Sequence, residues 1–358
     1  MKDRHFCVTL AAIAVLASGV RVETQRQEFP FQIFERYLQP LMEQIGMPGL
    51  SAVIFQGGRI AWKGEYGYAD VEKKIPMTID TPIPVGGITQ AVTGVLVGVC
   101  IDRYAFEIDQ DIRNFVPTFP VAETRVRQVL AHATDGRFQY NPAYYSALTK
   151  VVEAPQCVNP SYRQAMATEV LDRLLMTRSV PGMDLGRPEG AAARDQFTAD
   201  KWNRYQSTLA EVAVPYRIDD KNRPFRSEYK SFGLDASSGL VSTANDLATF
   251  EKELYNGTPL SVSTLDRMWS NTVFTFPNFN LTTPTGLGWF VTNESGLKVV
   301  WTFGHIPDAS SALIVKMPAK QLTLIMVSNS GGLAKNYDLE NANVTSNPFV
   351  KIFLRLFI

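Results

Sequence analysis

The residues that could perform nucleophilic chemistry are missing from the place where they would be most effective. An apolar helical run is predicted to begin near Thr89, and residues 82–94, which lead into it, contain no serine, cysteine or lysine. No serine occurs in residues 52–145, and no lysine occurs in residues 75–149. Thr89 is the one hydroxyl at the start of this helix.

Covalent hydrolysis needs a nucleophile and a base close together. A serine at a helix N-terminus benefits from peptide dipoles that stabilise developing negative charge, and a lysine one turn later can take its proton. Ser295 and Lys298 have this S-x-x-K spacing, but they lie in a predicted hairpin turn between two strands. Because a motif needs its structural context, we interpret this match as chance.

The elements that would position a site follow a simple order, with strand patterns at both ends of the chain and helical patterns in the middle. Irregular structure is predicted for the Gly-, Pro- and Arg-rich region from Gly182 to Asn222. The predicted strands are Leu50–Phe55, Arg59–Gly64, Thr285–Thr292, Leu297–Phe303, Ser311–Met317 and Gln321–Ser328, and the predicted helices are Phe31–Ile45, several between Thr89 and Leu175, and Pro348–Ile358.

This order predicts an α+β fold, in which an antiparallel sheet built from both chain ends is flanked by helices and carries an inserted helical lobe. We expect one domain over residues 29–358, with a sheet lobe at about 29–81 and 285–358 and a helical lobe at about 82–284. A hydrophobic content of 45% supplies a large core. The cleft between the two lobes is the expected binding site.

The N-terminus has the pattern of an export signal. Lys2 and Arg4 precede the short apolar run Phe6–Leu16, and small residues follow as a cleavage site. We expect a signal peptide over residues 1–19 and a flexible lead over residues 20–28, and hence a periplasmic or extracellular protein; an uncleaved N-terminal helix is the alternative. The apolar run is short for a membrane span, and none is expected after signal removal.

Charge and cysteine content limit the possible partners. Thirty-five basic residues balance thirty-five acidic ones without a basic run, so nucleic acid and anionic membranes are not favoured as partners. Cys7 lies in the expected signal, and Cys100 is expected to be buried in an apolar helix. An exported protein could pair Cys100 with Cys157, which the sequence leaves open. The spacing predicts no metal site, and no cofactor is expected.

Several stretches, spread over almost the whole mature chain, share the pattern of one known family. They are MPGLSAVIFQGGRIAWKGEYGYADVEKKIPMTIDTPIPVG, FEIDQDIRNFVPTFP, TRVRQVLAHATDG, SSGLVSTANDLATF, GLGWFVT, TFGH and LIMVSNSG. Through them the chain resembles the serine β-lactamase and penicillin-binding-protein superfamily, in particular its class C β-lactamase-related branch of D-alanyl-D-alanine carboxypeptidases and esterases. The resemblance implies a serine hydrolase fold.

The resemblance also implies three catalytic motifs, and this chain departs from each of them. The serine of S-x-x-K falls on Gly87 and the lysine on Gln90, which supply neither a nucleophile nor a basic nitrogen. The Y-x-N motif becomes Tyr140-Asn141-Pro142, which keeps the tyrosine that helps to shuttle the serine proton in relatives. The K-T-G or H-x-G motif becomes His305-Ile306-Pro307, whose proline lacks a backbone donor. Asp308 adds a negative charge near the strand that would supply an oxyanion donor.

Two further matches, His132 at a helix end and Asp246 as a helix cap, are expected to belong to the framework. Tyr140 and His305 also have structural interpretations, as a half-buried aromatic and a strand residue. No residue is therefore assigned as catalytic. The binding candidates are Tyr140, Asn141, His305 and Asp308.

Three hypotheses follow from these residues. The first is an exported, catalytically inactive homologue whose cleft binds a small-molecule or peptide-like ligand, or an envelope protein. The second is an active esterase, peptidase or β-lactamase-like hydrolase with a rearranged site that uses Tyr140, His305 or Thr89. The third is an interaction protein that works through residues 182–222 and the C-terminal helix. The joint loss of residues from all three motifs favours the first hypothesis.

Overall fold

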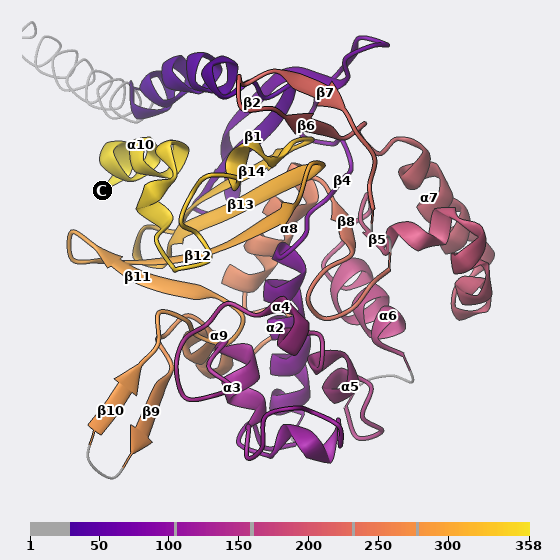
Figure 1. The fold of residues 1–358 in the computed structure, drawn as a ribbon, viewed down its shortest axis with the longest axis vertical. Helices are drawn as coiled ribbons and strands as arrows, with labels where there is room; N and C mark the ends of the chain where they lie inside the picture. Colours follow the sequence, from indigo (N-terminus) through magenta and orange to yellow (C-terminus); the bar gives the residue numbers. More distant parts are fainter. Residues whose placement is uncertain (1–28, 104–105, 158–160, 231–232, 277–278) are drawn as a thin grey trace, which may run out of the picture.

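A seven-stranded antiparallel sheet forms the centre of the molecule (Figure 1). The computed structural model describes residues 29–103, 106–157, 161–230, 233–276 and 279–358, so the expected signal and lead lie outside it. The sheet order is β11-β12-β13-β14-β1-β2-β3. Its strands are β1 (Gly49–Gln56), β2 (Arg59–Asp70), β3 (Ile75–Pro76), β11 (Phe290–Glu294), β12 (Leu297–Ile306), β13 (Ser310–Met317) and β14 (Leu322–Ser328). The predicted sheet from both chain ends is confirmed.

Helices cover both faces of this sheet, which explains why its strands are apolar on both sides. Leu50, Ala52 and Ile54 of β1 share one cluster with the helix over residues 29–45 and with α10 (Pro348–Phe357). Val53 points to the other face and joins the core of the helical lobe.

The helical lobe is built around α2 (Ile88–Asp102), every residue of which is buried from Ile88 to Cys100. Around it lie α3 (Val126–Leu130), α4 (Pro142–Tyr145), α5 (Leu148–Val152), α6 (Tyr162–Ala165), a π-helical turn (Met166–Asp172), α8 (Ala244–Tyr255) and α9 (Val262–Met268). Minor strands are β4 (Ile83–Pro84), β5 (Val180–Pro181), β6 (Tyr216–Ile218), β7 (Pro224–Arg226), β8 (Leu240–Ser242), β9 (Val273–Phe276) and β10 (Phe279–Thr282). The buried start of α2 packs against β12 of the sheet.

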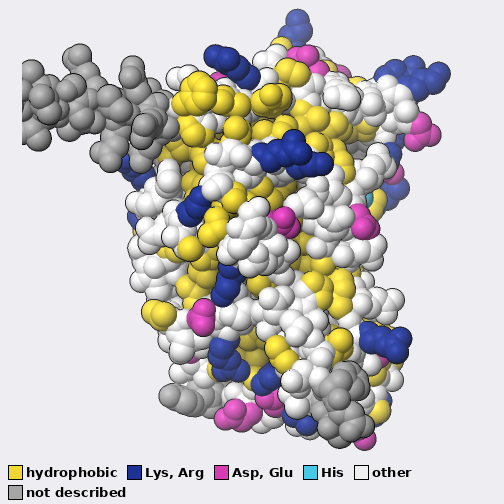
Figure 2. Space-filling view, turned by 90° about the vertical axis from the view of Figure 1, so that its left-hand side faces the viewer, with side chains coloured by type: hydrophobic (Ala, Val, Ile, Leu, Met, Phe, Trp, Pro, Cys, Tyr) yellow, Lys and Arg dark blue, Asp and Glu magenta, His cyan; other side chains and the backbone are white. Residues whose placement is uncertain are grey.

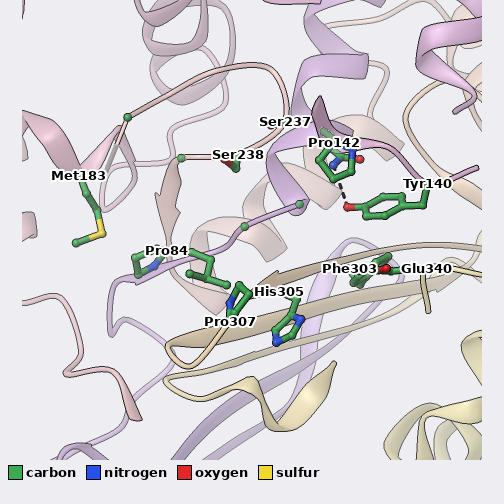
Figure 3. A pocket seen from close by; sticks show the side chains of 16 residues that line it. Pro84, Tyr140, Pro142, Met183, Ser237, Ser238, Phe303, His305, Pro307 and Glu340 are labelled. Atoms are coloured by element: carbon green, nitrogen blue, oxygen red, sulfur yellow. Dashed lines mark hydrogen bonds between the residues drawn. The ribbon is translucent and has the colours of Figure 1, made fainter. Parts of the chain in front are cut away.

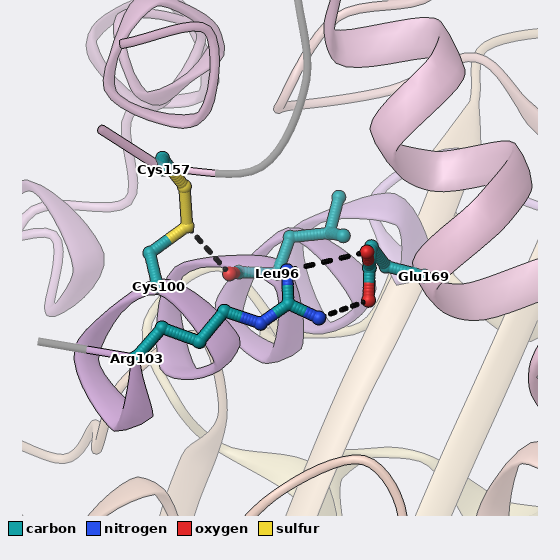
Figure 4. The surroundings of a disulfide bond; sticks show 5 residues. All are labelled: Leu96, Cys100, Arg103, Cys157 and Glu169. Atoms are coloured by element: carbon teal, nitrogen blue, oxygen red, sulfur yellow. Dashed lines mark hydrogen bonds and ion pairs between the residues drawn. A yellow bond between two sulfur atoms is a disulfide. The ribbon is translucent and has the colours of Figure 1, made fainter. Parts of the chain in front are cut away.

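A disulfide joins Cys100 of α2 to Cys157 in the loop after α5, which settles the pairing that the sequence left open (Figure 4). The two Cα atoms are 5.1 Å apart, within the usual range for such bonds. On the neighbouring turn, Arg103 pairs with Glu169 across the lobe, with an N–O distance of 2.7 Å. The C-terminal end of α2 is thus covalently tied to the loop after α5.

The prediction of an irregular region from Gly182 to Asn222 is wrong for its central part, which forms the helix α7 (Ala199–Ala210). The Thr198 hydroxyl accepts a hydrogen bond from the Lys201 N–H and caps this helix. Tyr205 is fully buried against a small cluster that includes Val180 and Val241. The prediction failed because it weighed the glycines and prolines of the region, whereas this amphipathic helix is stabilised by tertiary packing.

The surface carries charges of both signs. Figure 2 shows basic and acidic side chains scattered over one face of the molecule rather than gathered by sign. Among the described residues, no helix is long and apolar enough to span a bilayer. Nor do His, Cys, Asp and Glu side chains there form a cluster of three that could hold a metal ion.

Candidate functional site

A cavity of about 290 Å³ lies where the start of α2 meets the end of β12 (Figure 3). It is lined by Pro84, Gly86, Gly87, Gln90, Tyr140, Pro142, Met183, Gly233, Ser237, Ser238, Gly239, Phe303, His305, Ile306, Pro307 and Glu340. The structure thus places four positions singled out in the sequence, namely Gly87, Gln90, Tyr140 and His305, around one cavity.

Gly87 is held without a side chain because the sheet leaves no space for one. A Cβ atom built on Gly87 would lie 2.6 Å from the carbonyl oxygen of Phe303 and 2.9 Å from Oη of Tyr140. A Cβ atom on Gly86 would lie 3.0 Å from the backbone nitrogen of His305, and Gly86 has φ +52. Strand β12 therefore packs directly on the start of α2, where a nucleophilic hydroxyl would need room.

Gln90 joins a continuous chain of hydrogen bonds at the other position of the lost motif. The Asn141 N–H donates to Nδ1 of His132 (3.1 Å), so the proton of this imidazole sits on Nε2. Nε2 of His132 then donates to Oε1 of Gln90 (3.0 Å), and Nε2 of Gln90 donates to Oη of Tyr140 (2.9 Å). Every member of this chain is neutral, and each bond runs in the same direction.

Burial holds this chain in its neutral form. It lowers the pKa of His132 to about 3, and it raises the pKa of Tyr140 far above its ordinary range. His132 was expected to belong to the framework, and the structure gives it the central position in the relay. At neutral pH neither residue is ionised, so Tyr140 cannot act there as a phenolate base.

His305 lies on the β12 wall, apart from that relay. Its Nε2 is buried and has no hydrogen-bond partner among the described residues. A Cβ atom on Gly331 would lie 3.2 Å from this nitrogen, so the ring faces that loop. Burial lowers the pKa of His305. The ring is thus a neutral imidazole at neutral pH, and it forms no hydrogen bond with Tyr140 across the cavity (Figure 3).

Three other candidates point elsewhere. Oδ1 of Asn141 caps α4 by accepting from the Tyr144 N–H (3.0 Å), and Asp308 sits in the β12–β13 turn, 4.0 Å from Nζ of Lys230. Neither lines the cavity. Thr89 is completely buried and donates to the Gly86 carbonyl (2.7 Å), so its hydroxyl does not reach the cavity.

The structure also adds residues that the sequence did not suggest. Ser237 and Ser238 reach the cavity from the loop before β8, and Glu340 reaches it from the segment before α10. Ser237 is held by Asp235, to which its hydroxyl and backbone N–H donate. The serines lie in the family-like stretch SSGLVSTANDLATF, which could have suggested them, whereas no sequence pattern marks Glu340.

Comparison with known proteins agrees with the geometry. The profile of the Beta-lactamase family matches residues 34–346. The chain is 34% identical over 113 residues to "Beta-lactamase" of Escherichia coli (strain K12), covering 31% of this chain and 29% of that protein. It is 27% identical over 86 residues to human "Serine beta-lactamase-like protein LACTB, mitochondrial", covering 24% of this chain and 16% of that protein. The aligned stretches thus span less than a third of these curated relatives.

Solved structures show the same fold. The octameric penicillin-binding protein homologue from Pyrococcus abyssi superposes with a TM-score of 0.69 at 21% identity, over 87% of this chain and 76% of that one. The class C beta lactamase from Rhodobacter sphaeroides gives a TM-score of 0.67 at 16% identity, over 91% of this chain and 99% of that one. Since the family profile spans most of the sequence and the fold agrees with it, the chain belongs to the Beta-lactamase family.

Proposed function

We propose that this chain is a catalytically inactive member of its family whose remaining cavity binds a ligand. The observation that carries this proposal is the contact between Phe303 and Gly87, which fills the space that an attacking hydroxyl would need. The neutral relay through Gln90 supports it, because an amide nitrogen cannot accept the proton that a serine would release.

The alternative of a rearranged hydrolase finds little support in these contacts. Thr89 is enclosed, and the hydroxyl of Tyr140 accepts from Gln90. Although His305 could accept a proton, no hydroxyl lies within hydrogen-bond distance of its buried Nε2 among the described residues. A general base needs a nucleophile or a water held at hydrogen-bond distance, and the site offers no protein nucleophile of this kind.

Export forms part of the proposal. The disulfide between Cys100 and Cys157 supports it, since such bonds persist in oxidising compartments. A pocket that is kept while its chemistry is lost fits a binding role for a small molecule or a peptide-like ligand. A binding site for an envelope protein would need a larger surface than this cavity presents.

Covalent labelling tests the loss of catalysis. Purified protein would be incubated with a fluorescent penicillin and, separately, with a fluorophosphonate probe, beside an active class C β-lactamase as positive control. We expect no stoichiometric adduct on this chain, because residue 87 supplies no oxygen to acylate. A heat-denatured sample controls for non-specific reaction, and a stoichiometric adduct on Ser237 or Ser238 would refute the proposal.

A further inference from the structure

The lining of the cavity carries a single formal charge. Of the described residues that line it, Glu340 is the only one with a formal charge, and none is lysine or arginine. Lys335 acts electrostatically on His305, but its ammonium and that of Lys230 are directed to other groups. Nζ of Lys335 donates to the Ile218 carbonyl (2.9 Å), and Nζ of Lys230 lies 4.0 Å from Asp308.

Glu340 has no partner in the protein that would neutralise it. Its side chain forms no ion pair or hydrogen bond with any residue in the described ranges, and it is exposed at the cavity. Its charge nevertheless reaches the interior, since it acts electrostatically on both Tyr140 and His305. A carboxylate left in this way attracts a cation and repels an anion.

Three N–H groups at the start of α2 are satisfied within the protein. A helix N-terminus attracts anions through N–H groups that lack partners. Here the N–H groups of Ile88, Thr89 and Gln90 donate to the carbonyls of residues 85–87, at 3.2, 3.0 and 3.0 Å. The first turn therefore presents donors that are already in use.

The rest of the lining is apolar or neutral. Pro84, Pro142, Met183, Phe303 and Ile306 supply hydrocarbon surface. Tyr140 accepts from Gln90, which leaves its own hydroxyl hydrogen free to donate. At about 290 Å³ the cavity is near the lower end of ligand sites, which suits a single ring with a short substituent.

We propose that the cavity takes a compact amine, an apolar body whose protonated nitrogen is placed at Glu340, and disfavours carboxylates. This inference rests on the proposed function, in that it names the ligand class of the same cavity. β-Lactams and D-alanyl-D-alanine peptides both carry a carboxylate, to which the lining offers no cation. The site would thus have changed its preferred charge as well as its chemistry.

Three probes of one size and different charge test this inference: benzylamine, benzyl alcohol and benzoate. Calorimetric or NMR titration of the full protein should rank benzylamine first and benzoate last, with at least a tenfold span in Kd. Glu340→Gln should weaken benzylamine about fivefold, as expected for an exposed charge, and leave benzyl alcohol unchanged. Asp338→Asn, an exposed carboxylate in the same segment that does not line the cavity, is the matched control and should change neither.

Ser238→Trp, with folding checked by thermal unfolding, should abolish binding of all three probes by filling the cavity. Equal or tighter binding of benzoate would overturn the inference while leaving a ligand site in place. Benzylamine binding that is indifferent to Glu340→Gln or to Ser238→Trp would overturn it as well. If none of the probes binds at millimolar concentration, the binding role fails, and the inference fails with it.

Discussion

The residues that replaced the catalytic pair are matched to their surroundings. Gln90 uses its amide oxygen to accept from His132 and its amide nitrogen to donate to Tyr140. A lysine ammonium has donors only, so at this position it could not accept the hydrogen bond that Nε2 of His132 donates. Gly87 fits against the Phe303 carbonyl because it lacks a Cβ. The two substitutions thus belong to one packed arrangement that would resist simple reversal.

Restoring the motif should therefore fail. The double variant Gly87→Ser with Gln90→Lys is expected to show no esterase activity on p-nitrophenyl acetate above that of the wild type. It should also lose about 2–4 kcal/mol of unfolding free energy, since a Cβ placed 2.6 Å from a backbone oxygen overpacks the site and the lysine disrupts the relay. Denaturant unfolding measures the loss of stability, and the absorbance of released p-nitrophenolate measures the activity.

Gly233→Ser is the matched control for that variant. Gly233 also borders the cavity, but a Cβ built on it meets no atom within 4 Å, so its stability should change by less than about 0.5 kcal/mol. Robust esterase activity in the double variant would show that β12 can move aside from residue 87. The cavity would then still be shaped for catalysis.

At the scale of elements, the long periodic segments were predictable from sequence. The strands near Leu50, Arg59, Leu297 and Ser311 appear where their apolar patterns place them, because short apolar runs bounded by turn residues are typical of strands. Helix α7 was not predictable, because its apolar face is stabilised by packing on the cluster that Tyr205 joins, and that cluster forms only in the folded protein.

The contact between β12 and α2 was also beyond sequence reasoning. The motif pattern placed His305-Ile306-Pro307 on the strand that lines the cleft, and all three residues do line the cavity. In the structure the strand residues that face Gly86 and Gly87 are Phe303, Gly304 and His305, two positions earlier. This placement depends on where the β12–β13 hairpin turns and how β12 packs across the lobe, which are tertiary properties. The site positions could be named from sequence, but the close packing of β12 on Gly86 and Gly87 could not be predicted.

A buried ion pair connects α8 to the sheet. Nζ of Lys316 on β13 lies 2.7 Å from Oε2 of Glu251 on α8, both side chains are completely buried, and the ammonium sits 3.6 Å from the centre of the Trp289 ring. Burial lowers the pKa of Lys316 to about 8 and raises the pKa of Glu251. Each charge therefore needs the other to remain in the core.

Removing one partner should cost more than removing both. Lys316→Met is expected to lower the unfolding free energy by about 3–5 kcal/mol, because it strands the Glu251 carboxylate among apolar groups. The double variant Lys316→Met with Glu251→Leu should recover most of that loss, as determined by urea unfolding in a double-mutant cycle. Additive losses in the cycle would contradict this interpretation and indicate that the two groups act independently.

At the scale of the whole molecule, the disulfide between Cys100 and Cys157 is expected to contribute measurably to stability. The disulfide closes a loop of 57 residues and anchors α2, the helix whose N-terminus forms the floor of the cavity. In the chain-entropy description such a loop contributes about 4 kcal/mol to stability. Cys157→Ala should therefore lower the Tm by about 5–10 °C in calorimetry.

The same experiment connects stability to compartment. A reductant such as TCEP should lower the Tm of the wild type to that of Cys157→Ala and leave the variant unchanged, so the variant serves as its own control. Mature protein that begins after residue 19 should titrate no free thiol under denaturing conditions, because Cys7 would have left with the signal. Two free thiols per chain, or a Tm indifferent to reductant, would show that the bond does not form. The proposed export would then lose the structural feature that supports it.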